Sequence, residues 1–375
     1  MIGFVQDILS WALPFILMIT PVVFFHELGH FTVARFFGVK IETFSIGFGS
    51  EIFGWTDRKG TRWKLSWIPV GGYVKFFGDA DAASVPDREK LKSMSAPDRE
   101  GALEYKPLYQ RALIVAAGPV ANFVLAIVVF VVLFLSLGEV ATTPFVGKVE
   151  PGSAAAGAGI QSGDLIKAMN GKAVKSFEDV RDIILLDTGD PLAITLERHG
   201  HGLTVHATPR LTPVTDRFGD HYKVAILGIL PDPNPKATHI VRLGPIAALE
   251  QALGRVGLIV KSTWNYRLQL VSGAADASQL SGPVGIVKMS HDLASIDILA
   301  LVNLAALISV SVGLVNLFPI PILDGGHLLY YGCEAVLGRP LSARTQDLGF
   351  RLGLAVVLGL MVFATWNDLV RLNLF

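Results

Sequence analysis

The sequence predicts a polytopic α-helical membrane protein with about four transmembrane helices, a membrane-associated β-hairpin and a globular domain inserted between the second and third helices. Hydrophobic residues make up 51% of its 375 residues, and charged residues only 17%. Four apolar stretches reach the roughly 20 residues that are needed to cross the hydrocarbon of a bilayer. Lys and Arg balance Asp and Glu at 32 each. The chain therefore has no excess of positive charge that would favour a nucleic-acid partner.

The four apolar stretches are residues 8–37, 113–137, 298–318 and 348–366. Arg351 interrupts the last one, so its charged end must reach the membrane interface. No Lys or Arg precedes Ile8 and no small-residue cleavage site follows the first stretch, which excludes a secretory signal peptide. We therefore expect the first stretch to remain in the mature protein as a span.

Lys and Arg concentrate in the segment between the first and second spans, and Arg339 and Arg344 lie between the third and fourth. Positively charged loops stay in the cytoplasm, so these two segments are predicted to be cytoplasmic and both termini to face out. Residues 138–297 are then outside the membrane, which in a bacterium means the periplasm. The expected location is the bacterial inner membrane.

The inserted segment has the alternation and turn residues of a folded domain. The pattern predicts strands at Val146–Val149, Leu165–Met169 and Leu192–Arg198, helices at 154–158 and Phe177–Leu186, and a tight turn at Asn170-Gly171. The run from Val146 to Val174 resembles a PDZ domain. In bacterial membrane proteases this domain is circularly permuted, which implies limits near 143 and 232, with residues 226–229 as a loop that binds a peptide C-terminus. A small β-rich domain without a ligand is the alternative.

Between residues 244 and 270, apolar residues recur at the spacing of a helix, as at Ile246, Leu249 and Leu253, while Glu250 and Arg255 are polar. This pattern predicts an amphipathic helix that lies on the outer leaflet or against the spans. A helix that only packs within the protein is the alternative.

The sequence His26-Glu27-Leu28-Gly29-His30 ends the first apolar stretch. Histidines at i and i+4 lie on one face of a helix, so both can bind a single Zn²⁺. Glu27, next to the first histidine, can act as the general base on a water molecule. Titratable groups at membrane depth are costly without partners, so this pattern predicts a functional metal site.

Catalytic zinc sites use three protein ligands and leave a position open. The comparable acid near another span is Asp324, which follows Asn316 and the two prolines Pro319 and Pro321. The first and third spans run in the same direction, so their inner ends lie at one depth, and Asp324 can complete a His2Asp site. The prolines should unwind the helix before Asp324, which membrane proteins tolerate where the backbone is buried or lines a polar cavity. The single cysteine, Cys333, excludes a Cys-based zinc site.

With these motifs in this order, the chain resembles the site-2 proteases, a family of M50 zinc metalloproteases, and in particular the regulator-of-sigma-E branch. The resemblance implies that His26, His30 and Asp324 bind zinc, that Glu27 is the catalytic base and that Asn316 contacts the substrate backbone. His327 follows Asp324 too closely to bind the same metal without unwinding of the helix, so we expect it to support the ligands or the fold instead. Known members of this branch have two PDZ domains, whereas one fits here.

Two further segments match the same family. Residues 62–67 and 71–78 alternate like two strands and predict a β-hairpin. In the family this sheet re-enters the membrane and binds substrate at its edge, which assigns that role to Gly72, Tyr73 and Val74; an ordinary cytoplasmic hairpin is the alternative. Gly118-Pro119 with Asn122 resembles a second family motif, for which we favour close helix packing over direct catalysis.

These predictions divide the chain as follows: a first transmembrane helix with the zinc motif at 1–38, a cytoplasmic loop with the re-entrant hairpin at 39–107, a second transmembrane helix at 108–138, the periplasmic PDZ domain at 139–232, an amphipathic helix and linker at 233–297, and the third and fourth transmembrane helices at 298–375.

The function expected from the sequence is regulated intramembrane proteolysis of single-pass membrane proteins, such as anti-sigma factors, and of remnant signal peptides. An inactive PDZ scaffold is the alternative, but it predicts a damaged ligand set, and His26, Glu27, His30 and Asp324 are all present. A metal transporter would need a polar pathway across the bilayer, whereas these residues gather at one end of two spans.

Overall fold

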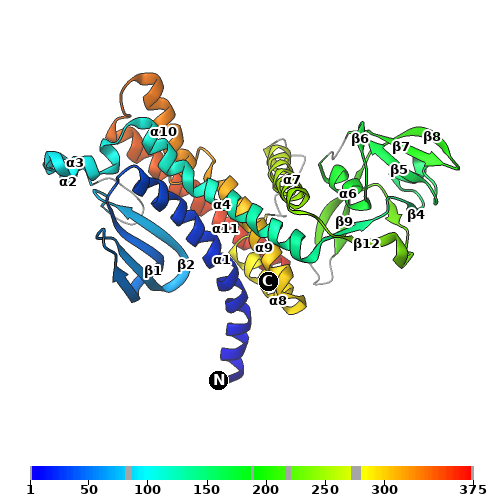
Figure 1. Ribbon diagram of the computed structural model, residues 1–375, viewed down its shortest axis with the longest axis horizontal. Coiled ribbons are helices and arrows are strands. Elements are labelled where there is room, and N and C mark those ends of the chain that lie inside the picture. Colours follow the sequence, from blue (N-terminus) through cyan, green and yellow to red (C-terminus); the bar gives the residue numbers. More distant parts are fainter. Residues whose placement is uncertain (1, 81–86, 187–189, 216–220, 272–279, 373–375) are drawn as a thin grey trace. The chain divides into compact units, whose positions relative to one another are not determined.

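The computed structural model describes residues 2–80, 87–186, 190–215, 221–271 and 280–372 (Figure 1). They fall into two compact units. The first unit is Met1–Val129 with Leu280–Phe375, and the second is Phe130–Gln279.

Within the described residues, four helices are long and apolar enough to cross a membrane. They are α1 (Ile2–Phe36), of which Ser10–Phe36 qualifies, α4 (Leu108–Leu137), α9 (Ile298–Asn316) and α11 (Ala343–Arg371). The prediction of four spans is confirmed, with the fourth helix longer at both ends than expected. The protein is a polytopic α-helical membrane protein.

Two further helices of the first unit, α8 (Pro283–Ile296) and α10 (Asp324–Leu337), were not predicted. The pattern had assigned α8 to a linker, but Ile286 and Leu293 pack on buried Met18 of α1. The N-terminal amides of α8 are satisfied from α11, because the Asp368 carboxylate accepts from the Gly285 amide at 2.7 Å and from the Gly282 amide at 2.9 Å. Polar residues such as Lys288 within α8 had hidden its apolar face.

The predicted hairpin is wrong in its pairing. Residues 62–67 and most of 71–78 belong to one long strand, β2 (Arg62–Phe76), and the partner of both halves is β1 (Ile41–Thr56). Thr43, for instance, lies opposite both Arg62 and Lys75. Each strand can change direction along its length because Gly47 and Gly71 adopt φ values of +85° and +107°, which favour glycine. The glycines of β1 also interrupt its alternation, which is why the sequence did not reveal it.

The sheet is anchored to α1 through an aromatic core. Phe44 of β1 is buried, and its ring lies 5.4 Å from that of Phe31 of α1. Val74 of β2 joins the same cluster. The short helices α2 (Arg88–Ser93), α3 (Ala96–Gly101) and η1 (Leu103–Tyr105) connect the sheet to α4. The strand segment that follows Gly71 is thereby held beside the helix that carries the histidines.

The second unit is rich in strands. Its elements are β3 (Glu139–Thr142), β4 (Val146–Val149), α5 (Ala154–Gly157), β5 (Leu165–Met169), β6 (Lys172–Ala173), α6 (Phe177–Leu186), β7 (Leu192–Arg198), β8 (His201–Ala207), β9 (Arg210–Thr215), β10 (His221–Ile226), β11 (Ile229–Pro231), η2 (Pro235–Ala237), β12 (Thr238–Val241) and α7 (Pro245–Val271). A four-stranded antiparallel sheet has the order β6-β5-β7-β8, while β11 pairs with β4 and β12 with β3. The predicted strands β4, β5 and β7 and the helix α6 are confirmed.

The predicted tight turn between β5 and β6 is confirmed as well. Asn170 and Gly171 both adopt positive φ, at 47° and 75°, as a type I′ turn requires. The helix predicted between residues 244 and 270 corresponds to α7 (Pro245–Val271). Around these elements a core of buried apolar residues forms, with Ile166, Leu192 and Ile194 at 0% exposure.

Candidate metal centre

Helix α1 carries His26, Glu27 and His30 on consecutive turns. The two histidine rings lie 4.8 Å apart, and their Nε2 atoms approach to 3.2 Å. Both rings are buried, at 9% and 8% exposure, in a helix that is otherwise apolar. This part of α1 lies very close to α4, since a Cβ at Gly29 would lie 2.3 Å from the Ala117 carbonyl oxygen.

Asp324 comes from a different part of the chain. Helix α9 ends at Asn316, and the chain then turns through Pro319 and Pro321 before α10 begins at Asp324, as the proline pair predicted. Ile322 adopts a φ of 115°, a rare backbone conformation for a β-branched residue. The connection therefore presents Asp324 as the first residue of α10.

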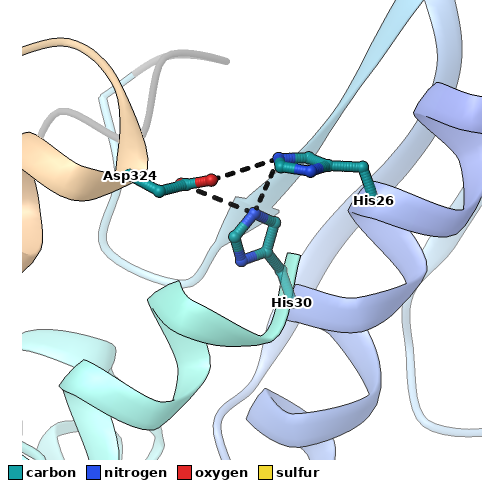
Figure 2. Close-up of side chains that lie close together, drawn as sticks. All are labelled: His26, His30 and Asp324. Carbon is teal, nitrogen blue, oxygen red and sulfur yellow. Dashed lines mark hydrogen bonds and ion pairs between the residues drawn. The ribbon is translucent and has the colours of Figure 1, made fainter. Parts of the chain in front are cut away.

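The carboxylate of Asp324 meets both histidines, as Figure 2 shows. Its Oδ2 lies 3.2 Å from His26 Nε2, and its Oδ1 lies 3.5 Å from His30 Nε2. Among the described residues these side chains form a group whose ligand atoms all lie within 4.8 Å of one another. The three side chains thus converge on one point from two helices.

This donor set fits zinc. With metal–ligand bonds near 2.0–2.1 Å, two ligand atoms of a tetrahedral site lie about 3.3 Å apart. The distances between the facing atoms here are 3.2, 3.2 and 3.5 Å. Asp324 Oδ2 is also a buried oxygen with no hydrogen-bond donor among the described residues, which a cation would satisfy.

The centre opens into a cavity of about 530 Å³. Every site residue predicted from the sequence lines this cavity: His26, Glu27, His30, Gly72, Tyr73, Val74, Asn316 and Asp324. Strand β2 passes close to the proposed base, since a Cβ at Gly72 would lie 3.5 Å from Glu27 Cγ. The residues are brought together as expected, while their roles in catalysis stay predictions.

His327, one turn after Asp324 on α10, lines the cavity, where the sequence led us to expect a supporting role. Other residues of the cavity were not assigned a function from the sequence, namely Tyr331 and an ion pair formed by Arg111 of α4 and Glu334 of α10. The Arg111 guanidinium also donates to the Lys106 carbonyl at 3.1 Å and lies 4.9 Å from the centre of the Tyr331 ring. Their only signal in the sequence was a charge or an aromatic ring beside an apolar segment.

The electrostatics of α10 suit a metal ligand. Burial acts to raise the pKa of the Asp324 carboxyl, but the positive charge of the His30 and His26 rings beside it outweighs burial and holds this pKa well below its usual range. Asp324 is therefore a carboxylate at neutral pH. Burial lowers the pKa of His327, so that its imidazole is neutral.

The spans and the convergent His2Asp group define a membrane metalloenzyme, and comparison with known proteins specifies it further. Residues 14–360 match the model of Peptidase family M50. The chain is 46% identical over 363 residues to an Agrobacterium fabrum protein named "putative zinc metalloprotease", with 97% of this chain and 96% of that protein covered. It is 40% identical over 397 residues to "Metalloprotease MmpA" of Caulobacter vibrioides, with 100% and 98% covered.

A Rhizobium meliloti protein that is also named "putative zinc metalloprotease" is 43% identical over 364 residues, covering 97% of both chains. The chain therefore belongs to peptidase family M50. It is a zinc metalloprotease of the membrane, as its motifs predicted.

Proposed function

We propose that this enzyme cleaves single-pass membrane proteins within or at the edge of the bilayer, in the manner of a site-2 protease. The observation that carries this proposal is the position of the converging His26, His30 and Asp324 side chains, two of which lie on a helix long enough to span the membrane. A centre on such a helix acts where water is scarce and where a peptide bond is normally hidden in a helix.

In this mechanism His26, His30 and Asp324 hold the zinc, which lowers the pKa of water and stabilises negative charge on the scissile carbonyl. Glu27 accepts the proton of the attacking water and returns it to the leaving amine. Asn316, at the end of α9, lines the cavity and orients the substrate backbone through its side-chain amide.

The substrate must be extended before its peptide bond can be attacked. Residues 72–76 of β2 pair with β1 on one side, and Gly72, Tyr73 and Val74 line the cavity. A substrate segment that adds to this strand as a further β-strand regains the backbone hydrogen bonds lost from its helix. In this mode the substrate is bound mainly through its backbone.

The decisive variant is Glu27→Gln. The amide fills the same space but cannot accept the proton, so zinc should stay bound while cleavage of a single-pass substrate in detergent or vesicles falls by about 10²–10⁴-fold. Glu89→Gln on the exposed face of α2 is the matched control, and it should leave both quantities unchanged. Substantial turnover by Glu27→Gln would mean that another group is the base.

The zinc assignment has its own test. Wild type should bind one Zn²⁺ per chain. A triple variant His26→Ala, His30→Ala, Asp324→Ala should bind none. Full occupancy in the triple variant, measured by metal analysis of the purified protein, would contradict the assignment.

We further propose that the β-rich unit is a permuted PDZ domain in the periplasm of a bacterial inner-membrane protein, and that the active site lies toward the cytoplasm. In support, β11 pairs with β4, and Gly228 next to it accepts a hydrogen bond from the Glu150 amide at 2.8 Å. This arrangement supplies a loop at residues 226–229 that is suited to a peptide C-terminus.

By the same proposal the domain excludes substrates with bulky ectodomains, so that anti-sigma-factor-like proteins are cut only after a first cleavage outside the membrane. Deletion of residues 139–232 should raise cleavage of a substrate that retains its ectodomain and leave cleavage of a trimmed one nearly unchanged. Loss of cleavage of the trimmed substrate, with zinc still bound, would make the domain a required recruiter instead.

A further inference from the structure

Helix α4 contacts the Nδ1 atom of both histidines. The Ile114 carbonyl oxygen lies 2.9 Å from His30 Nδ1, and the side-chain amide of Asn122 lies 3.2 Å from His26 Nδ1. In each ring the other nitrogen, Nε2, is the one that faces Asp324. The two contacts therefore fix which nitrogen of each ring is available to a metal.

The protonation of the rings follows from this geometry. A neutral histidine that binds metal through Nε2 carries its proton on Nδ1, and this N–H needs an acceptor. Ile114 offers a carbonyl oxygen, which can only accept. Asn122 has the same ability in its Oδ1, a buried atom without a hydrogen-bond partner among the described residues.

We infer that Asn122 is a positioning residue, whose Oδ1 accepts a hydrogen bond from the Nδ1–H group of His26 and thereby presents Nε2 to the zinc. The amide nitrogen and oxygen exchange places by a half-turn of the amide group, so either atom can occupy the position 3.2 Å from His26. This inference rests on the proposed function, because it takes His26 to be a zinc ligand.

Asn122 is held in place more firmly than packing alone requires. It is 0% exposed, and Ser309 of α9 donates to its backbone carbonyl at 2.9 Å. Gly313, one turn further on α9, leaves room for it, since a Cβ there would lie 3.2 Å from Asn122 Cβ. A residue fixed from two helices is well suited to orient a third group.

The same face of α4 also accommodates the second ligand. A Cβ at Gly118, one turn before Asn122, would lie 2.2 Å from His30 Nε2, the atom that faces Asp324. The motif of Gly118 and Asn122 was interpreted above as close helix packing. That interpretation fits Gly118 but is incomplete for Asn122, whose amide contacts a ligand.

The test measures metal affinity in the full-length protein in detergent, by competition between the protein and a chelator for Zn²⁺ and for Co²⁺. Asn122→Leu, which keeps the branched shape but has no acceptor, should weaken binding by about 10–100-fold. Asn122→Asp, which keeps the acceptor, should bind at least as tightly as wild type. Asn122→Ala takes the place of the Leu variant if that protein does not fold.

Ser290→Ala is the matched control, because it removes a buried hydroxyl of α8, which donates to the Val287 carbonyl at 2.7 Å, from a helix that carries none of the ligands. It should lower the thermal unfolding midpoint and leave metal affinity unchanged. The absorption spectrum of bound Co²⁺ reports the ligand geometry directly, so it should change in Asn122→Leu and not in Ser290→Ala.

Equal metal affinity in Asn122→Leu and wild type would overturn the inference. So would an equal loss in the Leu and Asp variants, because a retained acceptor would then not preserve metal binding. If instead His26→Ala retained wild-type zinc affinity, the proposed function itself would fail, and the inference would fail with it.

Discussion

The two units of the chain are built in opposite ways. In the β-rich unit the buried cluster consists of apolar residues, such as Ile166 and Leu196, both at 0% exposure. In the helical unit, residues such as His30 and Asn122 are buried, while Val128 of α4 is 52% exposed. Apolar surface is a cost in water but not in hydrocarbon. The difference teaches that the hydrophobic effect organises the β-rich unit, whereas close packing and polar contacts organise the spans.

The largest effect that tests this difference is expected at the ion pair between α4 and α10. Arg111 is 8% exposed and holds both carboxylate oxygens of Glu334. Arg111→Met should cost about 3–5 kcal/mol, because it leaves a buried charge without its partner. The double variant Arg111→Met, Glu334→Leu should recover most of that loss. Thermal unfolding in detergent measures both.

A solvent-exposed ion pair provides the control. Arg62 and Glu51 of the sheet are paired but remain 43% and 32% exposed in their side chains, so Arg62→Met should cost about 0–1 kcal/mol. If Arg111→Met proved as mild as Arg62→Met, polar contacts would not be what holds the helical unit together.

A smaller effect is expected when a charged residue is placed at an exposed apolar position of each unit. Val128 is 52% exposed on a membrane helix, and Leu211 is 49% exposed on a strand of the β-rich unit. Val128→Asp should cost about 2.5–3.5 kcal/mol in membrane insertion. Leu211→Asp should change stability by only about 0.5 kcal/mol. Insertion assays and protease resistance of the full chain give the two values, and equal penalties would remove the distinction between the solvents.

The smallest effect concerns a buried carboxyl between the sheet and α2. Burial raises the pKa of Asp79 to about 7, and nearby Glu104 and Glu42 add to this, although the Phe76 amide donates to it at 3.0 Å. The folded-state pKa lies above the value near 3.9 of an unfolded chain. Protonated Asp79 therefore contributes its full stabilisation to the folded state below about pH 4, and this stabilisation is lost as the pH rises through about 7.

Asp79→Asn keeps an acceptor for the Phe76 amide but does not titrate. As the pH rises from about 6 to about 8, the free energy of unfolding of this variant should increase by about 1.4 kcal/mol relative to that of wild type. About one pH unit of the range between the unfolded-state and folded-state pKa values of Asp79 lies there. Thermal unfolding at both pH values measures the gain. A variant that parallels wild type across this range would show that Asp79 does not titrate there.

Much of the metal centre was predictable because its signals are local. The spacing of His26 and His30 fixes a shared helical face, and two prolines fix where α9 stops before Asp324. The role inferred for Asn122 was not predictable, since it depends on how two helices cross. The side chain alone does not indicate whether it meets a histidine or a methyl group.

The sheet shows the opposite case. Residues 62–67 alternate clearly and were recognised as a strand, but their partner β1 contains glycines at positions where the alternation would appear. Glycine carries no side chain, so a bend that is essential to the pairing leaves no polar or apolar pattern. Helix α10 was missed for a related reason, because its short length and mixed composition resemble a loop.

The contact at Gly29 has a consequence for how this enzyme tolerates mutation. Gly29 has no side chain with which to bind a metal, yet a single added methyl group would lie only 2.3 Å from the Ala117 carbonyl oxygen. Both histidines lie on α1 together with Gly29, whereas Asp324 lies on α10. A random mutagenesis screen for loss of function should therefore find position 29 as intolerant as the ligands themselves, for reasons of spacing alone.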